Sequence, residues 1–251
     1  MKEASQISSV SLLSLSERRH IAGEIFYARD KEKSALRTYN VFRGAAEYVR
    51  NLCGLQAFFD NVPEGRPILD VGAGRGYAAE EFADVAFSHE RRFIGTALRF
   101  NRSLVNAFGE GNFHITSAEV LRGVEDESIG GILGVYSAPA YSVNHAQVAR
   151  RFNEVLVPGG IIKVSLFLTS PSRTNFMKEL SELGYDVMAQ RVDKRIIVVA
   201  IKPGGEKKIS ARELLTKDNQ TRTSQEHQVG MATLSNHFRR TLGRGLLRFV
   251  G

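Results

Sequence analysis

Short apolar runs alternate with stretches of helical periodicity along most of the chain. The runs of strand length are bounded by glycine, proline or acidic turns, which favours buried strands. The predicted strands are 67–70, 93–98, 112–116, 129–135 and 161–167. Apolar residues recur at helical spacing in the segments between them, at 77–86, 101–108, 144–156 and 172–183. This alternation predicts a three-layer α/β fold, with a mostly parallel sheet between two layers of helices.

The last two predicted strands differ from the others because no helix separates them. Tyr185–Arg191 and Arg195–Lys202 are joined only by the short loop 192–194. This spacing predicts a hairpin, so the final strand is expected to be antiparallel to the rest. Earlier in the chain, the proline and glycines of Val157–Gly160 are expected to end a helix and turn the chain into the next strand.

The two ends of the chain show different patterns from the middle. Residues 1–39 are expected to form a lead-in followed by helices, and residues 40–203 to form the main domain. Residues 204–251 are expected to form a basic tail. Within this tail, the polar stretch from Thr216 to Gln228 predicts a mobile segment, and 234–249 predicts a basic amphipathic helix.

Charge is concentrated in the tail. The formal net charge of the chain is +7, and residues 204–251 hold nine basic and four acidic residues, so the main body is nearly neutral. Apolar positions in the amphipathic segment recur every four residues, and so do arginines beside them. The apolar positions are Leu234, Phe238, Leu242 and Leu246, and the arginines are Arg240, Arg244 and Arg248. Such a helix suits an anionic membrane surface, nucleic-acid phosphates or an acidic groove on a partner, or it packs on its own domain.

Composition indicates an ordinary globular protein. The chain has 251 residues, of which 43% are hydrophobic and 24% are charged, enough for one large domain with appendages. Cys53 is the single cysteine, which excludes an intramolecular disulfide, and it is expected to be a small apolar residue on a helix. No apolar run approaches the roughly 20 residues of a membrane-spanning helix, and the polar start lacks a secretory pattern. These features predict a soluble, cytoplasmic protein.

The most informative motif is a glycine-rich turn after the first predicted strand. Asp70 ends that strand, and Gly72, Gly74 and Gly76 follow at alternate positions before a predicted helix. Glycine permits a sharp turn at positive φ and lets backbone N–H groups approach a ligand closely. The spacing differs from the G-x-G-x-x-G pattern of dinucleotide sites, which favours another cofactor. A purely structural role for the glycines, as a tight turn into a helix, is the alternative.

The segment Asp70–Gly76 resembles the first motif of the class I S-adenosylmethionine-dependent methyltransferases, and the likeness extends from about residue 40 to 203. The resemblance implies a Rossmann-like sheet that ends in an antiparallel strand. It also implies S-adenosyl-L-methionine as cofactor, with Asp70 and the three glycines at its methionine end. The remaining cofactor-binding residues that it implies are Ala97, Leu98, Ala118, Glu119 and Tyr136.

Three carboxylates of the family pattern are missing. Ala97 stands where an acid normally bonds the ribose hydroxyls, Ser117 where one contacts the adenine, and Gly130 where one begins the fourth strand. Loss of a charge-assisted ribose contact is expected to weaken cofactor binding by about 1.5 to 3 kcal/mol. The segment Glu154–Gly160, in contrast, resembles the family's segment in which a helix ends and the next strand begins.

The resemblance leaves the reaction partner open. The residues after the fourth predicted strand, 136–141, are not the Asn-Pro-Pro-Tyr of amino-directed methylation of nucleic acids or glutamine. Tyr141 and His145 are the only nearby residues with acid–base potential, and no metal is expected because carboxylates do not cluster. The sequence thus predicts a methyltransferase for an unidentified small molecule or protein. The alternative is a catalytically inactive, methyltransferase-like binding or scaffolding protein whose basic tail recruits a partner.

Overall fold

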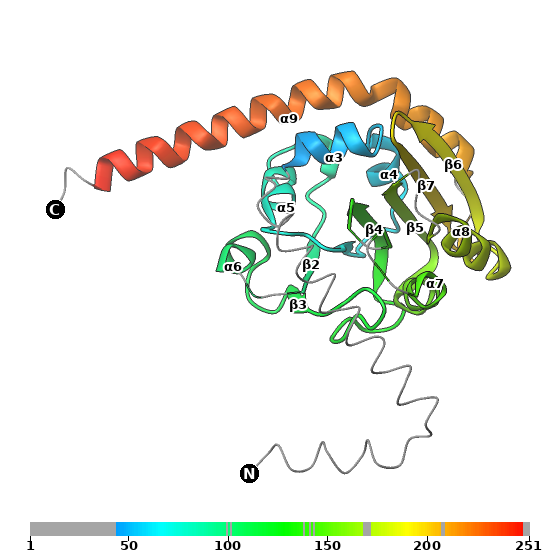
Figure 1. Ribbon diagram of the computed structural model, residues 1–251. Helices are drawn as coiled ribbons and strands as arrows, with labels where there is room; N and C mark the ends of the chain where they lie inside the picture. Colours follow the sequence, from blue (N-terminus) through cyan, green and yellow to red (C-terminus); the bar gives the residue numbers. More distant parts are fainter. Residues whose placement is uncertain are drawn as a thin grey trace, which may run out of the picture. The chain divides into compact units, whose positions relative to one another are not determined.

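A seven-stranded sheet lies at the centre of the chain (Figure 1). The computed structural model describes residues 44–98, 100, 102–137, 139–140, 142, 144–167, 172–206 and 209–247, with side chains in the last segment as far as Thr233. All of these residues belong to one compact unit, 42–251. The lead-in and helices predicted for 1–39 lie outside the described residues.

The strand order is β3-β2-β1-β4-β5-β7-β6. The strands are β1 (Ile68–Asp70), β2 (Phe93–Ala97), β3 (Phe113–Ile115), β4 (Ile129–Val135), β5 (Leu156–Phe167), β6 (Asp186–Val192) and β7 (Arg195–Ile201). Strands β1 to β5 pair in parallel, whereas β7 lies antiparallel between β5 and β6. The predicted α/β fold with an antiparallel final strand is confirmed.

Helices cover both faces of the sheet (Figure 1). The described helices are α3 (Ala45–Asn51), α4 (Gln56–Asn61), α5 (Tyr77–Phe82), the 3-10 turn η1 (Ala86–Ser88), α6 (Arg102–Phe108), α7 (His145–Val155), α8 (Ser172–Glu182) and α9 (Ala211–Leu247). Along β7, Ile197 and Val199 pack with α3, α4 and α9, whereas Ile196 and Val198 pack with α7 and α8. This period-two alternation of apolar residues is what places the sheet between two helical layers.

Three local predictions were wrong in detail. Cys53 is buried, but it lies at φ 57° in the turn between α3 and α4 and not on a helix. The helix predicted over 77–86 ends at Phe82, and η1 follows it. The chain does not turn at Val157–Gly160 before a strand, because β5 already begins at Leu156. The end of β7 supports this extension, since Gly159 N donates to Lys202 O at 3.1 Å.

The predicted mobility of Thr216–Gln228 was also wrong, because this stretch belongs to α9. Its polar side chains satisfy backbone donors of the loop and helix opposite. Asp218 Oδ1 accepts from Ala57 N at 2.6 Å, and Gln225 Oε1 accepts from Leu55 N at 2.7 Å. Both acceptors are almost fully buried. Polar composition here therefore reflects buried hydrogen bonding and not a solvated chain.

A buried ion pair fixes α9 to the sheet. Lys163 lies in the middle of β5, and its Nζ donates to Asp218 Oδ2 at 2.5 Å and to Gly54 O at 2.8 Å. Both charged side chains have no exposed surface. Burial lowers the pKa of Lys163 and raises the pKa of Asp218, and the contact between them opposes both shifts. A Cβ on Gly54 would lie 2.0 Å from Asp218 O, so α9 approaches this turn too closely for any other residue.

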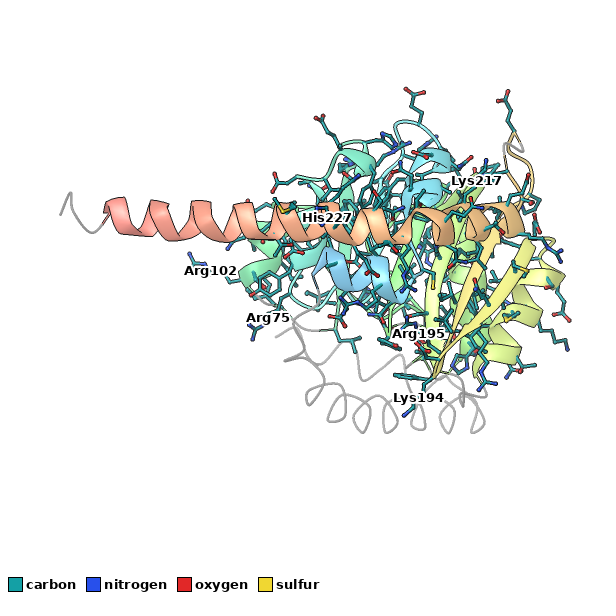
Figure 2. All side chains as sticks on the ribbon, turned by 90° about the horizontal axis from the view of Figure 1, so that it is seen from above. Arg75, Arg102, Lys194, Arg195, Lys217 and His227 are labelled. Carbon is teal, nitrogen blue, oxygen red and sulfur yellow. The ribbon has the colours of Figure 1, made fainter. Side chains whose placement is uncertain are left out.

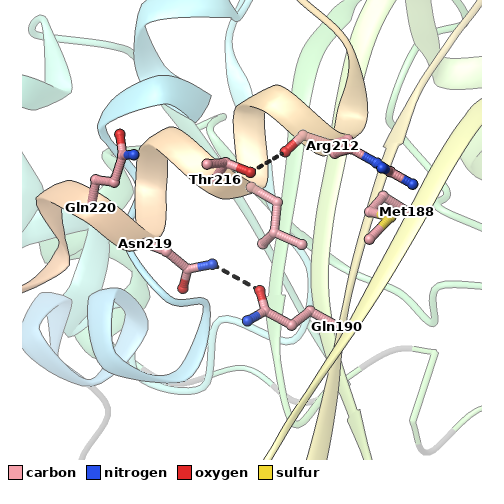
Figure 3. Close-up of a pocket in the computed structure, with 7 residues that line it drawn as sticks. Met188, Gln190, Arg212, Thr216, Asn219 and Gln220 are labelled. Atoms are coloured by element: carbon pink, nitrogen blue, oxygen red, sulfur yellow. Dashed lines mark hydrogen bonds between the residues drawn. The ribbon is translucent and has the colours of Figure 1, made fainter.

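A second contact of α9 is with β6. A pocket of about 410 Å³ lies between the two elements, with Met188 and Leu215 among its lining residues. Across it, Asn219 Nδ2 donates to Gln190 Oε1 at 2.8 Å (Figure 3). The first half of α9 thus packs against helices and sheet together. None of the described helices has the length and apolarity needed to cross a membrane.

Candidate cofactor site at the glycine turn

The glycine turn lies where the chain reverses its direction of travel across the sheet. β1 pairs with β2 on one side and with β4 on the other. In open α/β sheets, ligands bind outside the carboxyl ends of the strands at such a switch point. Asp70 ends β1, and the turn that follows it leads directly into α5. The predicted motif therefore occupies the position in the fold where ligand binding is expected.

All three glycines adopt left-handed backbone conformations, at φ 69°, 62° and 80° for Gly72, Gly74 and Gly76. Packing explains two of them. A Cβ on Gly72 would lie 2.6 Å from Ser137 Cβ, and one on Gly76 would lie 2.5 Å from Ala107 Cβ. At Gly74 a Cβ would meet nothing within 4 Å. The backbone at Gly74 is therefore open to a ligand from outside the chain.

Strand β2 holds the turn in place. Thr96 Oγ1 accepts from Gly72 N at 3.1 Å, and Thr96 O accepts from Ala73 N at 2.9 Å. The turn closes on itself where Gly76 N donates to Ala73 O at 2.9 Å. Thr96 was not among the predicted site residues. A hydroxyl near the end of the strand beside the glycine turn was the available signal for its role.

The carboxylate of Asp70 faces α3. Its Oδ1 accepts from the hydroxyl of Tyr48 at 2.7 Å, and both side chains are buried. Tyr48 comes from the helix layer over the sheet and was not among the predicted site residues. This hydrogen bond fixes the side chain of Asp70, the residue that precedes the glycine turn, against α3.

The predicted ribose and adenine residues lie along the carboxyl ends of β2 and β3. Ala97 is 3% exposed, and its carbonyl accepts from Thr116 N at 2.9 Å, which brings the two strand ends together. Leu98, one residue further, is 50% exposed. Ala118 packs in the apolar cluster that contains Val71, next to the turn. These positions therefore border one edge of the candidate site.

Two further predicted positions bear on the missing acids. Ser117 and Glu119 are partly buried beside Ala118, and Glu119 O accepts from Gln147 Nε2 at 3.3 Å. Gly130, in contrast, lies at the amino end of β4, where its N donates to Pro67 O at 2.9 Å. A Cβ there would lie 2.6 Å from Arg66 Cβ. The absence of an acid at this position is a consequence of packing at the opposite end of the sheet, so its loss does not bear on the candidate site.

Tyr136 begins the segment that follows β4. It lies at φ 46°, which is unusual for a tyrosine, and its N donates to Ser165 Oγ at 3.2 Å. Its ring stacks on Phe167, with 5.1 Å between ring centroids. The next residue, Ser137, lies beside Gly72, where a Cβ would be 2.6 Å from Ser137 Cβ. Because β4 and β2 flank β1 on opposite sides, Tyr136 borders the glycine turn on the side opposite to β2.

Of the two candidate catalytic residues, the structure describes His145. Tyr141 lies outside the described residues. His145 is the first residue of α7 and is partly buried, and the preceding Asn144 caps the helix by accepting from Gln147 N at 3.0 Å. Among the described residues, no three His, Cys, Asp or Glu side chains converge as ligands for a metal ion.

The residues present fit S-adenosylmethionine at one end better than at the other. Open backbone at Gly74 and ordered glycines on either side suit the close approach of an amino-acid moiety. At the ribose end, the methyl group of Ala97 offers no acceptor, and Thr96 Oγ1 already accepts from Gly72 N. The fit of the cofactor therefore depends on the glycine turn and not on a ribose contact.

Comparison with known proteins finds similar solved structures at low sequence identity. No family model and no curated protein matches the chain. It is similar to 1,6-didemethyltoxoflavin-N1-methyltransferase of Burkholderia thailandensis, at 17% identity over 77% of this chain and 92% of that one, with a TM-score of 0.45. It is also similar to the antibiotic-resistance methyltransferase Kmr, at 14% identity over 64% and 95% of the two chains, with a TM-score of 0.44.

A third similar structure is the [4+2]-cyclase SpnF, at 14% identity over 60% of this chain and 80% of that one, with a TM-score of 0.45. These likenesses concern the fold alone. The strand order with an antiparallel β7 is that of the Rossmann-like sheet that the sequence resemblance implied. Because a fold does not determine a function, the reaction has to be argued from the site.

Proposed function

We propose that the chain binds S-adenosylmethionine at the glycine turn and transfers its methyl group to a small molecule or protein. The observation that carries this proposal is the open, left-handed backbone at Gly74, at the switch point of the sheet. When bound, the cofactor supplies an activated methyl group on a sulfonium ion. Every other step falls to residues of this chain.

Positioning is the main task of these residues. The backbone of Gly72–Gly76 holds the amino-acid end, with Asp70 and Tyr48 behind it. The exposed side chain of Leu98 offers an apolar surface to the adenine, beside Ala118 and Glu119. Tyr136 then lies on the side of the turn where the acceptor would enter. Holding two reactants in line accounts for most of the rate enhancement that this reaction needs. Tyr141 and His145 remain proposals as the base.

Isothermal titration calorimetry with S-adenosylmethionine and S-adenosylhomocysteine tests the proposal. We expect a dissociation constant of about 1 μM to 1 mM, the usual range for enzyme substrates. Absence of heat at millimolar ligand would contradict the proposal.

The Ala97→Asp variant is expected to strengthen binding of S-adenosylhomocysteine about 10-fold or more. The reason is that a carboxylate at 97 would accept charge-assisted hydrogen bonds from the ribose, worth about 1.5 to 3 kcal/mol. Calorimetry measures the change, and Ala97→Asn serves as the control of similar size without the charge. If the fold is intact by circular dichroism and the affinity of the Asp variant is unchanged or lowered, the ribose does not bind beside β2.

A second candidate function is a binding protein without turnover. Two observations favour it: the buried methyl group of Ala97 at the expected ribose contact, and the carboxylate of Asp70 turned toward Tyr48. Such a protein would bind neither ligand, or bind the cofactor without consuming it. Prolonged incubation with labelled cofactor and cell extract separates the two candidates, since only the enzyme would leave label on an acceptor.

For the tail, we propose contact with an anionic membrane surface through 234–249. α9 continues as a helix to Leu247, and no acidic residue follows Glu226 in the sequence. The four-residue apolar repeat of this segment favours lipid over nucleic acid, because phosphate contacts alone do not need apolar positions. Cytoplasmic localisation, which such a contact would suit, also remains a prediction.

Truncation after Thr233 is expected to abolish sedimentation with vesicles that contain phosphatidylserine and to leave S-adenosylhomocysteine affinity within twofold. The shortened α9 keeps Asp218 and Gln225, so the domain retains its anchor. Vesicles of phosphatidylcholine alone are the control, because each arginine near an anionic surface contributes about 1 kcal/mol. Equal sedimentation with both vesicles, or with and without the segment, would exclude this contact.

A further inference from the structure

Beside the candidate site lies a guanidinium that has no carboxylate partner among the described residues. Arg195 begins β7 directly opposite Phe167, at the carboxyl end of β5. Its Nη1 donates to Asn51 Oδ1 at 2.8 Å and lies 3.4 Å from the hydroxyl of Tyr136, and its Nη2 donates to Arg50 O at 3.0 Å. All three acceptors are neutral.

The guanidinium has bonding capacity left over. It carries five N–H donors, whereas three contacts are made within the described part of the chain. Its Nε is buried and has no hydrogen-bond acceptor there. A partly buried cation that meets only neutral acceptors loses hydration without gaining a counter-charge. Planar guanidinium groups bind carboxylate and phosphate oxygens most strongly, through paired charge-assisted bonds.

Other cations gather around Arg195. Arg50 at the end of α3, Arg191 on β6 and Lys194 in the hairpin turn are all exposed, and Asp193 is the one acidic residue in that turn. Figure 2 shows Lys194 extending away from the fold while the neighbouring Arg195 lies closer to it. The end of the sheet at β5 and β7 therefore has a positive local charge, which favours an anion.

Arg195 and the glycine turn lie on either side of the segment that follows β4, so one ligand can contact both. The hydroxyl of Tyr136 is 3.4 Å from the guanidinium, and the next residue, Ser137, lies so close to Gly72 that a Cβ there would be 2.6 Å from Ser137 Cβ. Tyr136 and Ser137, in the segment after β4, therefore lie between the two sites. A small molecule that bridges this distance would present one end to the glycine turn and the other to Arg195.

We propose that Arg195 binds an oxyanion group, carboxylate or phosphate, of the methyl acceptor. The proposal rests on the proposed function and adds to it the chemical class of the acceptor. The stacked rings of Tyr136 and Phe167 form the apolar wall beside this group. Without a ligand, Arg195 also caps the end of α3 through Arg50 O, so a structural role and a binding role have to be distinguished by experiment.

Calorimetric titration of the full chain with inorganic phosphate and, separately, with acetate makes this distinction, at constant ionic strength in chloride. We expect binding of at least one of the two anions, weakened at least 10-fold in Arg195→Gln. The Lys194→Gln variant is the matched control, because it removes the same charge from the adjacent exposed residue, and its affinity should stay within twofold. The preferred anion identifies the group as phosphate or carboxylate.

A second variant and a second ligand distinguish a binding role of Arg195 from a structural role. If Arg195→Gln does not fold by circular dichroism, Arg195→Lys keeps the charge but loses the paired geometry and should still weaken the anion at least threefold. S-adenosylhomocysteine affinity should change less than twofold in either variant, so loss of the anion alone separates this site from the cofactor site. No anion binding in the unmodified chain, or equal weakening by Lys194→Gln, would overturn the proposal. Anion binding without any cofactor binding would overturn only the proposed function.

Discussion

Replacing Asp218 by Ala is expected to destabilise the protein by about 3–5 kcal/mol, the cost of leaving a buried charge without its partner. Of its two acceptors in the described part of the chain, Lys163 Nζ would retain Gly54 O alone, in a place without exposed surface. Ala57 N would lose its acceptor as well. Unfolding in guanidinium chloride, followed by circular dichroism, measures the change.

Two companion variants show whether the buried charge is the cause. Asp126→Ala removes a partner of similar distance, 2.6 Å from Arg151, but Asp126 is 69% exposed, so we expect a loss of less than about 1 kcal/mol. The double variant Lys163→Met/Asp218→Leu removes both charges and should recover a large part of the stability lost in Asp218→Ala. Equal effects of the buried and exposed substitutions would show that α9 is not held by this pair.

Replacing Gly74 by Ala is expected to weaken S-adenosylhomocysteine binding at least 10-fold, which is about 1.4 kcal/mol or more. The added methyl group would project from the open backbone into the space where the ligand should lie. Alanine at a positive φ also costs about 1–2 kcal/mol of stability. Stability loss alone therefore does not prove a binding role, and calorimetry has to be paired with thermal unfolding.

Gly65 provides the matched control for Gly74. It lies at φ 70° before β1, at the other end of the sheet, and a Cβ there also meets nothing within 4 Å. Gly65→Ala should thus cost similar stability while leaving ligand affinity within twofold. If both alanine variants lower the affinity equally, the effect comes from the fold, and the glycine turn is not the binding site.

The sheet and the glycine turn were predictable because their signals are local. Apolar runs between turn residues indicate strands wherever they occur, and the spacing of Gly72, Gly74 and Gly76 marks a turn without reference to the rest of the chain. The packing of α9 was not predictable in this way. Asp218 reads as a polar residue in a polar stretch, and its partner Lys163 is 55 residues away on a strand.

The candidate site was predictable to a smaller extent. Predicted positions at the ends of β1, β2 and β4 do meet at one edge of the sheet, whereas Gly130 lies at the opposite edge. The contacts of Tyr48 and Arg195 depend on helix α3 crossing the sheet, which no motif in the sequence encodes. Helical spacing of the polar Asp218 and Gln225 with the apolar Val229 was the signal available for α9.

A crystal structure of the chain grown with S-adenosylhomocysteine tests the central claim most directly. We expect the amino-acid end of the ligand against the backbone of Gly74, with the sugar beside Ala97 and no carboxylate on its hydroxyls. A glycine turn that stays empty at millimolar ligand, or a ligand bound elsewhere on the chain, would contradict it.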